Sequence, residues 1–276
     1  MSTGEAEQTV GPARLMAAGK RVAPHAARVV PPGLSRLASI YLDVLQGKGS
    51  GTGWDLRSES AADVTVLRGV ADPVVVNGGA NFGQWATECD ATLGNANARF
   101  FLIEPQQACQ SRLRALRIPN ATIIQAALGA QAGAGVLSGA APGYGAASLY
   151  ERHDTYFGDM SAHQETVSVR TLDDILDEHA LPRVDLLKLD VEGAELAALE
   201  GGTRSLEEGV VRAVAFEFGS ANIFSRTFFR DFWELLTPLG FEVARVLPGG
   251  RLLPIERYSE EHEHFRGVSN YLARRG

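Results

Sequence analysis

The stretch at residues 74–83 constrains the fold of this chain more than any other. It reads VVVNGGANFG, so a short buried-strand run leads directly into a glycine-rich turn. Gly78 and Gly79 allow the backbone to turn tightly and to approach a ligand where a side chain would collide. A second apolar run, FFLIEP, ends in Glu104, a carboxylate that can accept hydrogen bonds from both hydroxyls of a ribose. Together these features predict a nucleotide-type cofactor site.

From residue 71 onward, strand-like and helix-like segments alternate, which is the pattern of a parallel sheet covered by helices. The predicted strands are residues 74–76, 100–103, 121–124, 184–189 and 211–216. Five helices are predicted. The first begins at residue 84, the second includes residues 113 and 116, and the third begins after an N-cap at Thr171. The fourth and fifth cover residues 195–200 and 228–236. Gly201 and Gly202 are expected to end the fourth of these helices. Residues 241–246 and 267–272 have little helix between them and are expected to form an antiparallel hairpin at the sheet edge.

The chain is expected to divide near residue 70, into an N-terminal extension at 1–70 and a main domain at 71–276. Pro31 and Pro32 block any helix that would cross them, and apolar residues between 34 and 45 then recur at helical spacing. Residues 47–53, GKGSGTG, read as a flexible loop. The extension is interpreted as a lid, an oligomerisation arm or a helix that caps the main domain.

Composition excludes several classes of protein. The net charge of −7 argues against nucleic-acid binding, which needs a basic face to replace phosphate counterions. The two cysteines, Cys89 and Cys109, lack metal-type spacing, which favours a reducing cytoplasm over a disulfide framework. The polar start MSTGEAEQ does not resemble a signal peptide, and no apolar run is long enough to span a bilayer. A cytoplasmic protein is expected.

A second motif, LLKLDVEGAE at residues 186–195, adds chemistry to the cofactor turn. Lys188, Asp190 and Glu192 stand at alternate positions where a buried strand gives way to a turn. Period-two spacing puts the three charges on one side of the chain as long as it stays extended. Burying these charges away from water costs free energy, which partner residues or a bound ligand must offset. Ligands bind at the carboxyl ends of strands in open α/β sheets, and Asn77, Glu104 and Asp190 fall at such ends.

Five segments, VNGGANFG, FFLIEP, QAALG, TLDDIL and LLKLDVEGAE, resemble the FkbM-type S-adenosylmethionine-dependent methyltransferases over residues 74–273. The resemblance implies a class I methyltransferase fold, which is Rossmann-like, with a seven-stranded mixed sheet and a reversed last strand. It also implies S-adenosyl-L-methionine as cofactor and O-methylation of a small natural product, sugar or glycolipid.

The same resemblance implies roles for individual residues. Glu104 would hold the ribose, and the remaining cofactor contacts would come from the glycine turn and from the QAALG segment: Asn77, Gly79, Ala80, Asn81, Gly83, Ala126 and Ala127. The chain departs from the family at Asn77, where an acidic residue is usual, and at Gly78, where a bulkier apolar residue is usual. Asn keeps a hydrogen-bond acceptor but lacks the charge that favours the cofactor's ammonium group. On this basis Asn77→Asp is expected to leave cofactor affinity equal or tighter.

Methyl transfer to a hydroxyl needs alignment of the acceptor and removal of its proton. Asp190 is the first candidate for both tasks, with Glu192 and Lys188 shaping its charge environment; it could instead hold the cofactor or cap the next helix. Glu217, at the end of the fifth strand, is a second acidic candidate, although its position favours a structural partner of buried backbone.

Several other residues are weaker candidates. His153 and His163 lie in a polar insertion and either could act as a base, but surface positions are commoner. Tyr144 and Ser148 could contact the acceptor or simply belong to a flexible loop. The sequence His262-Glu263-His264 resembles part of a metal site, but no third ligand for a metal held by the two histidines can be predicted, so no metal site is expected. The aromatic residues between 224 and 233 have the spacing of one helix face, which favours core packing over an acceptor platform.

The sequence therefore predicts an S-adenosylmethionine-dependent O-methyltransferase that acts on a small or glycosidic hydroxyl acceptor and binds no nucleic acid. Two alternatives stay open. One is a cofactor-binding scaffold that has lost catalysis, which Asn77 would explain. The other is a nicotinamide-dependent oxidoreductase, although GGANFG does not match the G-x-G-x-x-G spacing that suits a pyrophosphate.

Overall fold

The computed structural model describes residue 23 and residues 30–49, 56–153, 155 and 158–276. The chain divides into two compact units, Met1–Asp43 and Val44–Gly276, and each is considered by itself. Helix α2 (Pro32–Leu45) begins in the first unit directly after Pro31, as its spacing predicts. Most of the segment before Pro31, and residues 50–53 of the predicted loop, lie outside the described residues.

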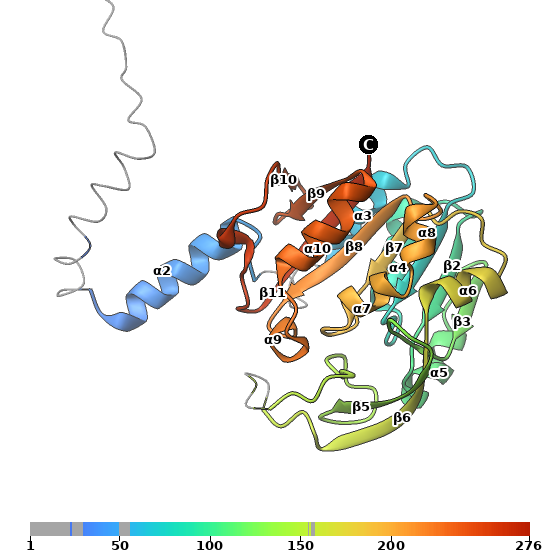
Figure 1. Cartoon of the computed structure of the whole chain (residues 1–276), viewed down its shortest axis with the longest axis horizontal. Coiled ribbons are helices and arrows are strands. Elements are labelled where there is room, and N and C mark those ends of the chain that lie inside the picture. The colour runs from blue at the N-terminus through green and yellow to red at the C-terminus, as the bar shows by residue number, and fades with distance from the viewer. Residues whose placement is uncertain (1–22, 24–29, 50–55, 154, 156–157) are drawn as a thin grey trace, which may run out of the picture. The chain divides into compact units, whose positions relative to one another are not determined.

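The second unit is built on an eight-stranded sheet (Figure 1). In spatial order its strands are β10 (Leu252–Pro254), β9 (Phe241–Val246), β11 (Val268–Arg275), β8 (Ala213–Gly219), β7 (Leu186–Leu189), β1 (Val74–Gly78), β2 (Arg99–Ile103) and β3 (Ala121–Ile124). The chain winds outward from β1 to β3 and then resumes on the other side of β1 at β7. The winding direction therefore switches between β1 and β7, which is where open α/β sheets bind ligands.

Strand directions confirm the predicted mixed, methyltransferase-like sheet. They also correct the predicted number of strands and the predicted position of the antiparallel pair. Neighbours from β3 to β8 pair in parallel, whereas β11 runs antiparallel to both β8 and β9. The antiparallel pairing of β9 with β11 is as predicted, but the pair is not at the edge, because β10 pairs antiparallel with β9. The predicted count of seven strands is thus wrong by one. The turn around Gly249 and Gly250, closed by the Leu247 N–H bond to the carbonyl of Arg251, folds the chain back to make the eighth.

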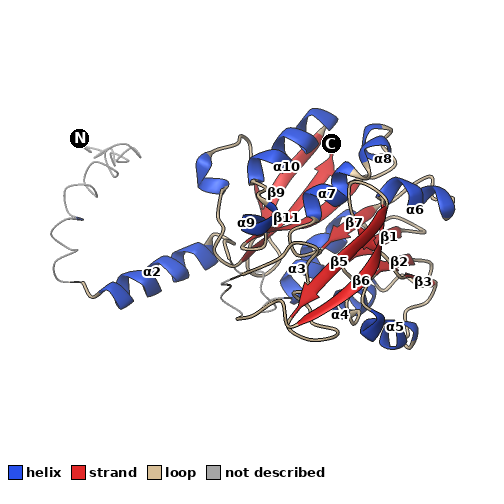
Figure 2. Cartoon of the chain, turned by 60° about the horizontal axis from the view of Figure 1, so that its bottom comes forward, coloured by secondary structure: helices blue, strands red, loops and turns tan. Residues whose placement is uncertain are grey.

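Apolar side chains fill both faces of the sheet, because alternate residues of each strand point to opposite sides. Val74 and Val76 join one buried cluster and Val75 joins the other. The first cluster is covered by α6 (Leu172–Glu178), α7 (Glu195–Glu200), α8 (Thr203–Glu207) and α10 (Phe229–Leu236). The second is covered by α4 (Gln84–Leu93) and α5 (Gln107–Arg114), together with Val64 and Leu67. Figure 2 shows the two helical layers on either side of the strands.

A second, three-stranded sheet was not predicted from the sequence. It consists of β4 (Ala127–Leu128), β6 (His163–Arg170) and β5 (Gly133–Gly139), with β5 and β6 paired antiparallel over their length. The glycine- and alanine-rich sequence of β5, GAGVLSG, hides the alternation typical of a strand. This small sheet follows directly from β3 in the chain and supplies residues to the site described below.

Helix α3 (Leu56–Asp63), with the short 3₁₀ turn Val64–Val66, packs with the main unit. Its sequence, LRSESAAD, is polar, yet Ser58, Glu59, Ser60 and Asp63 are all buried. Val64 and Leu67 belong to the same apolar cluster as α4. The predicted extension at 1–70 therefore contains residues that form part of the core of the second unit.

Helix ends follow the predicted signals, with one difference. The Thr171 side chain accepts a hydrogen bond from the Asp174 N–H and caps α6, as expected. Helix α7 ends at Gly201, but this glycine has an ordinary helical φ of −70°. It is needed for another reason: a Cβ there would lie 2.2 Å from the Gly129 carbonyl oxygen. None of the helices in the described part of the chain has the length and apolar character needed to span a bilayer.

Candidate functional site

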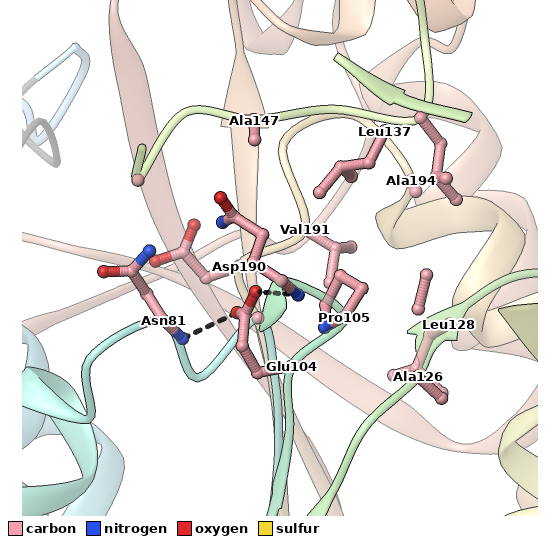
Figure 3. A pocket seen from close by; sticks show the side chains of 15 residues that line it. Asn81, Glu104, Pro105, Ala126, Leu128, Leu137, Ala147, Asp190, Val191 and Ala194 are labelled. Carbon is pink, nitrogen blue, oxygen red and sulfur yellow. Dashed lines mark hydrogen bonds between the residues drawn. The ribbon is translucent and has the colours of Figure 1, made fainter. Parts of the chain in front are cut away.

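A cavity opens at the carboxyl ends of the central strands. Gly79 follows β1, Glu104 follows β2, and Asp190 follows β7, so three strands that are distant in sequence bring these residues to one place. Polar groups lie on one side of the cavity and the apolar residues Ala126, Leu128, Leu137 and Ala194 on the other (Figure 3). A concave site with a few convergent polar groups and an apolar wall is typical of a small-molecule site.

The glycine turn after β1 is required by close backbone packing. Gly79 has a φ of +79°, and a Cβ on it would lie 1.7 Å from the carbonyl oxygen of Asp190. Its N–H and that of Ala80 both bond to the carbonyl oxygen of Ile103, which ties the turn to the end of β2. Asn81 also adopts a positive φ, of 46°, which Asn tolerates better than most residues. The turn is thus packed against the ends of β2 and β7, and its residues Gly79 and Asn81 line the cavity.

Glu104 is fixed by two backbone hydrogen bonds. One carboxylate oxygen accepts from the Asn81 N–H at 2.8 Å and the other from the Gln106 N–H at 2.9 Å, as Figure 3 shows. Burial raises the pKa of Glu104, and the two N–H bonds oppose that rise. Each carboxylate oxygen has a further lone pair. Glu104 can therefore accept hydroxyl hydrogen bonds from a ligand while its own position stays fixed.

The loop after β7 holds Asp190 and Val191 at the cavity. The chain turns away from the cavity after Val191. The Asp190 N–H bonds to the Gly78 carbonyl at 3.0 Å, and Asp190 and Val191 line the cavity. Glu195 accepts hydrogen bonds from the N–H groups of Val191 and Gly193, so its carboxylate holds the loop from the start of α7. Burial raises the pKa of Glu195 to about 7.

Glu192 does not share the environment predicted for it, because the extended backbone ends before it. Its φ is +52°, and its side chain forms a 2.8 Å ion pair with Arg152 instead of lining the cavity. Arg152 is itself buried, and it also donates to the Ala146 carbonyl. Burial raises the pKa of Glu192 to about 8, with the Asp190 charge adding to the rise and Arg152 opposing it.

Lys188 is buried in β7 and also does not line the cavity. Its Nζ lies 2.6 Å from a Glu59 carboxylate oxygen on α3 and 4.0 Å from one of Glu217 on β8. The surrounding carboxylates raise the pKa of Lys188 against the effect of burial, and Asp190 is one of them. Burial and the Asp190 charge raise the pKa of Glu217 well above its usual value. Lys188 thus balances a buried group of carboxylates and does not line the cavity.

The remaining predicted cofactor residues separate into two groups. Ala126 and Ala127 line the cavity together with Gly79, Asn81 and Glu104. Asn77, Ala80 and Gly83 do not.

These three residues have structural surroundings instead. Asn77 is 2% exposed in β1, where its amide donates to the Gly78 carbonyl. Ala80 belongs to the apolar cluster under α4. Gly83 starts α4 with a φ of +80°, and a Cβ there would lie 2.3 Å from a Leu116 methyl carbon.

None of the weaker candidates lines the cavity through its side chain. His153 is exposed beside Glu151, and His163 pairs with Gly139 in the small sheet. The Ser148 hydroxyl donates to the Glu192 carbonyl at 2.7 Å, and the Tyr144 carbonyl accepts from the Gln106 amide.

The two remaining groups also have structural roles. Glu263 caps α10 by accepting from two backbone N–H groups, and within the described ranges no cluster of metal-ligating side chains occurs. Phe229 and Phe232 are fully buried against Phe216 and Phe218, which confirms core packing for these two residues. Core packing is wrong for Phe228, which is 51% exposed.

Some residues of the site carry no signal in the sequence. Gly145, Ala147 and Leu149, from the loop after β5, complete the cavity wall. In the sequence, Gly145 and Ala147 belong to a stretch rich in glycine and alanine that has no strand or helix pattern. Glu59 and Arg152 reach their partners across 129 and 40 positions in sequence, and no local pattern announces such contacts.

The cavity fits S-adenosylmethionine on its own geometry. Gly79 and Asn81 line it at the turn after β1, and Glu104 offers fixed acceptors for hydroxyl groups. Ala126, Ala127, Leu128 and Leu137 provide an apolar wall for a flat heterocycle.

Comparison with known proteins identifies the family. A model of the methyltransferase FkbM domain matches residues 77–243, which is more than half of the chain. No curated protein sequence matches the chain.

Solved structures that resemble the chain include three methyltransferases. A methyltransferase FkbM from Methylobacillus flagellatus KT is 14% identical, with a TM-score of 0.48, over 77% of this chain and 47% of that one. The present chain thus spans about half the length of that protein. A precorrin-6y C5,15-methyltransferase from Geobacter metallireducens GS-15 is 14% identical, with a TM-score of 0.41, over 79% and 87% of the two chains. A SAM-dependent O-methyltransferase from Thermotoga maritima is 14% identical, with a TM-score of 0.39, over 79% and 65%.

The family assignment rests on the domain model, which begins at Asn77 in β1 and ends at Val243 in β9. It includes the glycine turn, Glu104 and the loop that carries Asp190. On this match the chain belongs to the FkbM methyltransferase family, whose cofactor is S-adenosyl-L-methionine.

Proposed function

We propose that the protein is an O-methyltransferase that transfers a methyl group from S-adenosylmethionine to a hydroxyl of a small natural product, sugar or glycolipid. The observation that carries the proposal is the cavity at the switch point, where Gly79, Glu104 and Asp190 meet. The two cysteines are free, which suits a reducing compartment, and we place the activity in the cytoplasm.

Each wall of the cavity has a role in this proposal. Glu104 binds the two ribose hydroxyls, and Ala126, Ala127 and Leu128 contact the adenine. The turn at Gly79 and Asn81 lies against the methionine portion. When bound, the cofactor supplies an electrophilic methyl group.

Asp190 acts on the acceptor. Its carboxylate lines the cavity at the end of β7, where it orients the acceptor hydroxyl by a hydrogen bond and accepts its proton. Glu195 holds the backbone of this loop, and the ion pair of Glu192 with Arg152 fixes the next residues. Lys188 keeps its charge inside the protein and moderates the negative potential around Asp190.

Calorimetric titration with S-adenosylmethionine, S-adenosylhomocysteine and NAD tests the cofactor part of the proposal. We expect micromolar binding of the first two and none of NAD. Binding of NAD alone would overturn the proposal in favour of an oxidoreductase.

Turnover tests the catalytic part. With a hydroxylated acceptor in hand, Asp190→Asn is expected to reduce kcat by about 100-fold or more, within the range typical of a lost general base, with unchanged cofactor affinity. A fall in cofactor affinity without a fall in kcat would make Asp190 a cofactor ligand. Binding of the cofactor with no turnover of any acceptor by the unmodified protein would favour the scaffold alternative, which the buried Asn77 keeps open.

A further inference from the structure

Helix α2 presents an unusually wide apolar surface. Six large apolar side chains on it are between 38% and 64% exposed, and no residue of the helix is buried. They are Leu34, Leu37, Ile40, Tyr41, Leu42 and Leu45. A contiguous exposed surface of this kind marks an interaction site with a partner or a membrane.

The apolar face of α2 covers more than half of its circumference. At 3.6 residues per turn, its apolar residues span an arc of roughly 200°. The polar stripe between the edges of that arc is narrow and consists of Ser35, Arg36, Ser39 and Asp43. Pairing with one other helix covers only a narrow seam, whereas a lipid surface covers a wide arc.

Charge identifies the partner more closely. Residues 1–45 contain five basic and three acidic residues, a net charge of +2 in a chain whose net charge is −7. The basic residues are Arg14, Lys20, Arg21, Arg28 and Arg36. Two copies of this segment would repel each other, whereas a surface of anionic lipid headgroups would attract it.

We propose that α2 lies flat on an anionic lipid surface, with its apolar face in the boundary between headgroups and acyl chains. Burial of the apolar side chains and attraction of the basic segment act together, and stable attachment generally needs two such contributions. This membrane-facing helix would carry the methyltransferase unit to the bilayer surface without spanning it.

Vesicle sedimentation tests the proposal on the full chain. Vesicles of phosphatidylcholine with phosphatidylglycerol are compared with vesicles of phosphatidylcholine alone. We expect at least about tenfold stronger binding to the anionic vesicles, and loss of most of this preference in 0.5 M NaCl, which screens the charges. Equal binding to both vesicle types, or binding to neither, would overturn the proposal.

Two paired variants separate the apolar face from the charge of the helix. Leu37→Asp with Tyr41→Asp places two negative charges on the apolar face, whereas Ser35→Asp with Ser39→Asp places the same charges on the polar stripe. The first pair is expected to reduce vesicle binding at least tenfold more than the second, because only the first disrupts the buried surface. Equal losses would show that charge alone binds the vesicles and would overturn the flat-lying helix.

Two further measurements identify other occupants of this surface. Sedimentation velocity without vesicles would overturn the proposal if it showed a dimer that Leu37→Asp with Tyr41→Asp dissolves. Titration with S-adenosylhomocysteine is expected to give the same affinity for all variants, because every cavity residue lies after residue 78. A weakened affinity in the apolar-face variant alone would show that α2 covers the methyltransferase unit of its own chain, which also contradicts the proposal.

Discussion

At the scale of single residues, Glu104 shows how a carboxylate can be both buried and available. Two backbone N–H groups hold its oxygens, yet each oxygen retains a lone pair at the cavity. The sequence predicted Glu104 and Asp190 as site residues because each directly follows an apolar strand, and strand ends meet at one edge of a parallel sheet. It could not predict the partners Glu59 and Arg152, because these contacts arise only when distant elements pack.

Glu104→Gln tests this residue directly. The amide can accept only one of the two N–H bonds, and it lacks the charge that strengthens hydrogen bonds to ligand hydroxyls. We expect the affinity for S-adenosylhomocysteine, measured by calorimetry, to fall about ten- to hundredfold. Glu207→Gln, on the exposed surface of α8, is the matched control and should bind normally. An unchanged affinity in Glu104→Gln would remove Glu104 from the cofactor site.

Asp63 is expected to make stability depend on pH. Burial raises its pKa to about 8 from 3.8, with Glu59 adding to the rise and Lys188 and the Trp85 indole opposing it. Between these two pH values the folded protein holds a proton that the unfolded chain has lost, so stability falls as pH rises through this window. Below pH 3.8 both states are protonated and the effect vanishes.

Asp63→Asn keeps a hydrogen-bond acceptor for the Trp85 indole N–H and removes the titratable carboxyl group. The free energy of unfolding in urea should therefore fall less between pH 6 and pH 8 in the variant, by on the order of 2 kcal/mol. Asp174→Asn, on the exposed side of α6, should follow the unmodified protein. A parallel pH profile for Asp63→Asn and the unmodified protein would mean that Asp63 is ionised in the fold.

At the scale of elements, the sequence predicted what periodicity and glycine can signal. The strands of the central sheet are apolar runs that end in polar or glycine residues, and this pattern can be recognised in a single sequence. Helix α3 was missed because its buried face is polar: Glu59 and Asp63 belong to the carboxylate group around Lys188. Strand β5 was missed because its glycine and alanine residues show no alternation.

The connection from β1 to α4 gives the sharpest test at this scale. Gly79→Ala must accommodate both a positive φ and a Cβ that lies 1.7 Å from the Asp190 carbonyl oxygen. Gly69→Ala is a matched control, because Gly69 has a φ of +80° and no atom within 4 Å of the added Cβ. Left-handed strain alone costs about 1–2 kcal/mol, so this is the loss expected for Gly69→Ala.

Gly79→Ala should lose several kcal/mol more than the control, because the loop after β7 has to move away from the turn. Urea unfolding measures the difference, and calorimetry should show weaker binding of S-adenosylhomocysteine only for Gly79→Ala. Equal stability of the two variants would mean that the turn and the Asp190 loop are not in contact in solution.

At the scale of the whole molecule, the question is where the methyltransferase unit begins. The sequence predicted a boundary near residue 70, where the alternation of strands and helices starts. The contacts of the chain divide it at residue 43, and α3 adds Glu59, Val64 and Leu67 to the interior of the second unit. Two truncations distinguish these boundaries.

Removal of residues 1–43 is expected to leave a folded unit with unchanged affinity for S-adenosylhomocysteine, because the cavity and both apolar clusters lie beyond it.

Removal of residues 1–70 leaves Lys188 without its 2.6 Å partner Glu59, which costs about 3–5 kcal/mol for a buried charge. It also uncovers the apolar surface under Val64 and Leu67, at about 1.5–3 kcal/mol for each side chain. These losses approach the whole stability of a typical domain. Thermal unfolding and calorimetry should therefore find a cooperative, ligand-binding protein for residues 44–276 and an unfolded or aggregated one for residues 71–276. Normal binding by residues 71–276 would place the boundary at residue 70 and reduce α3 to an accessory helix.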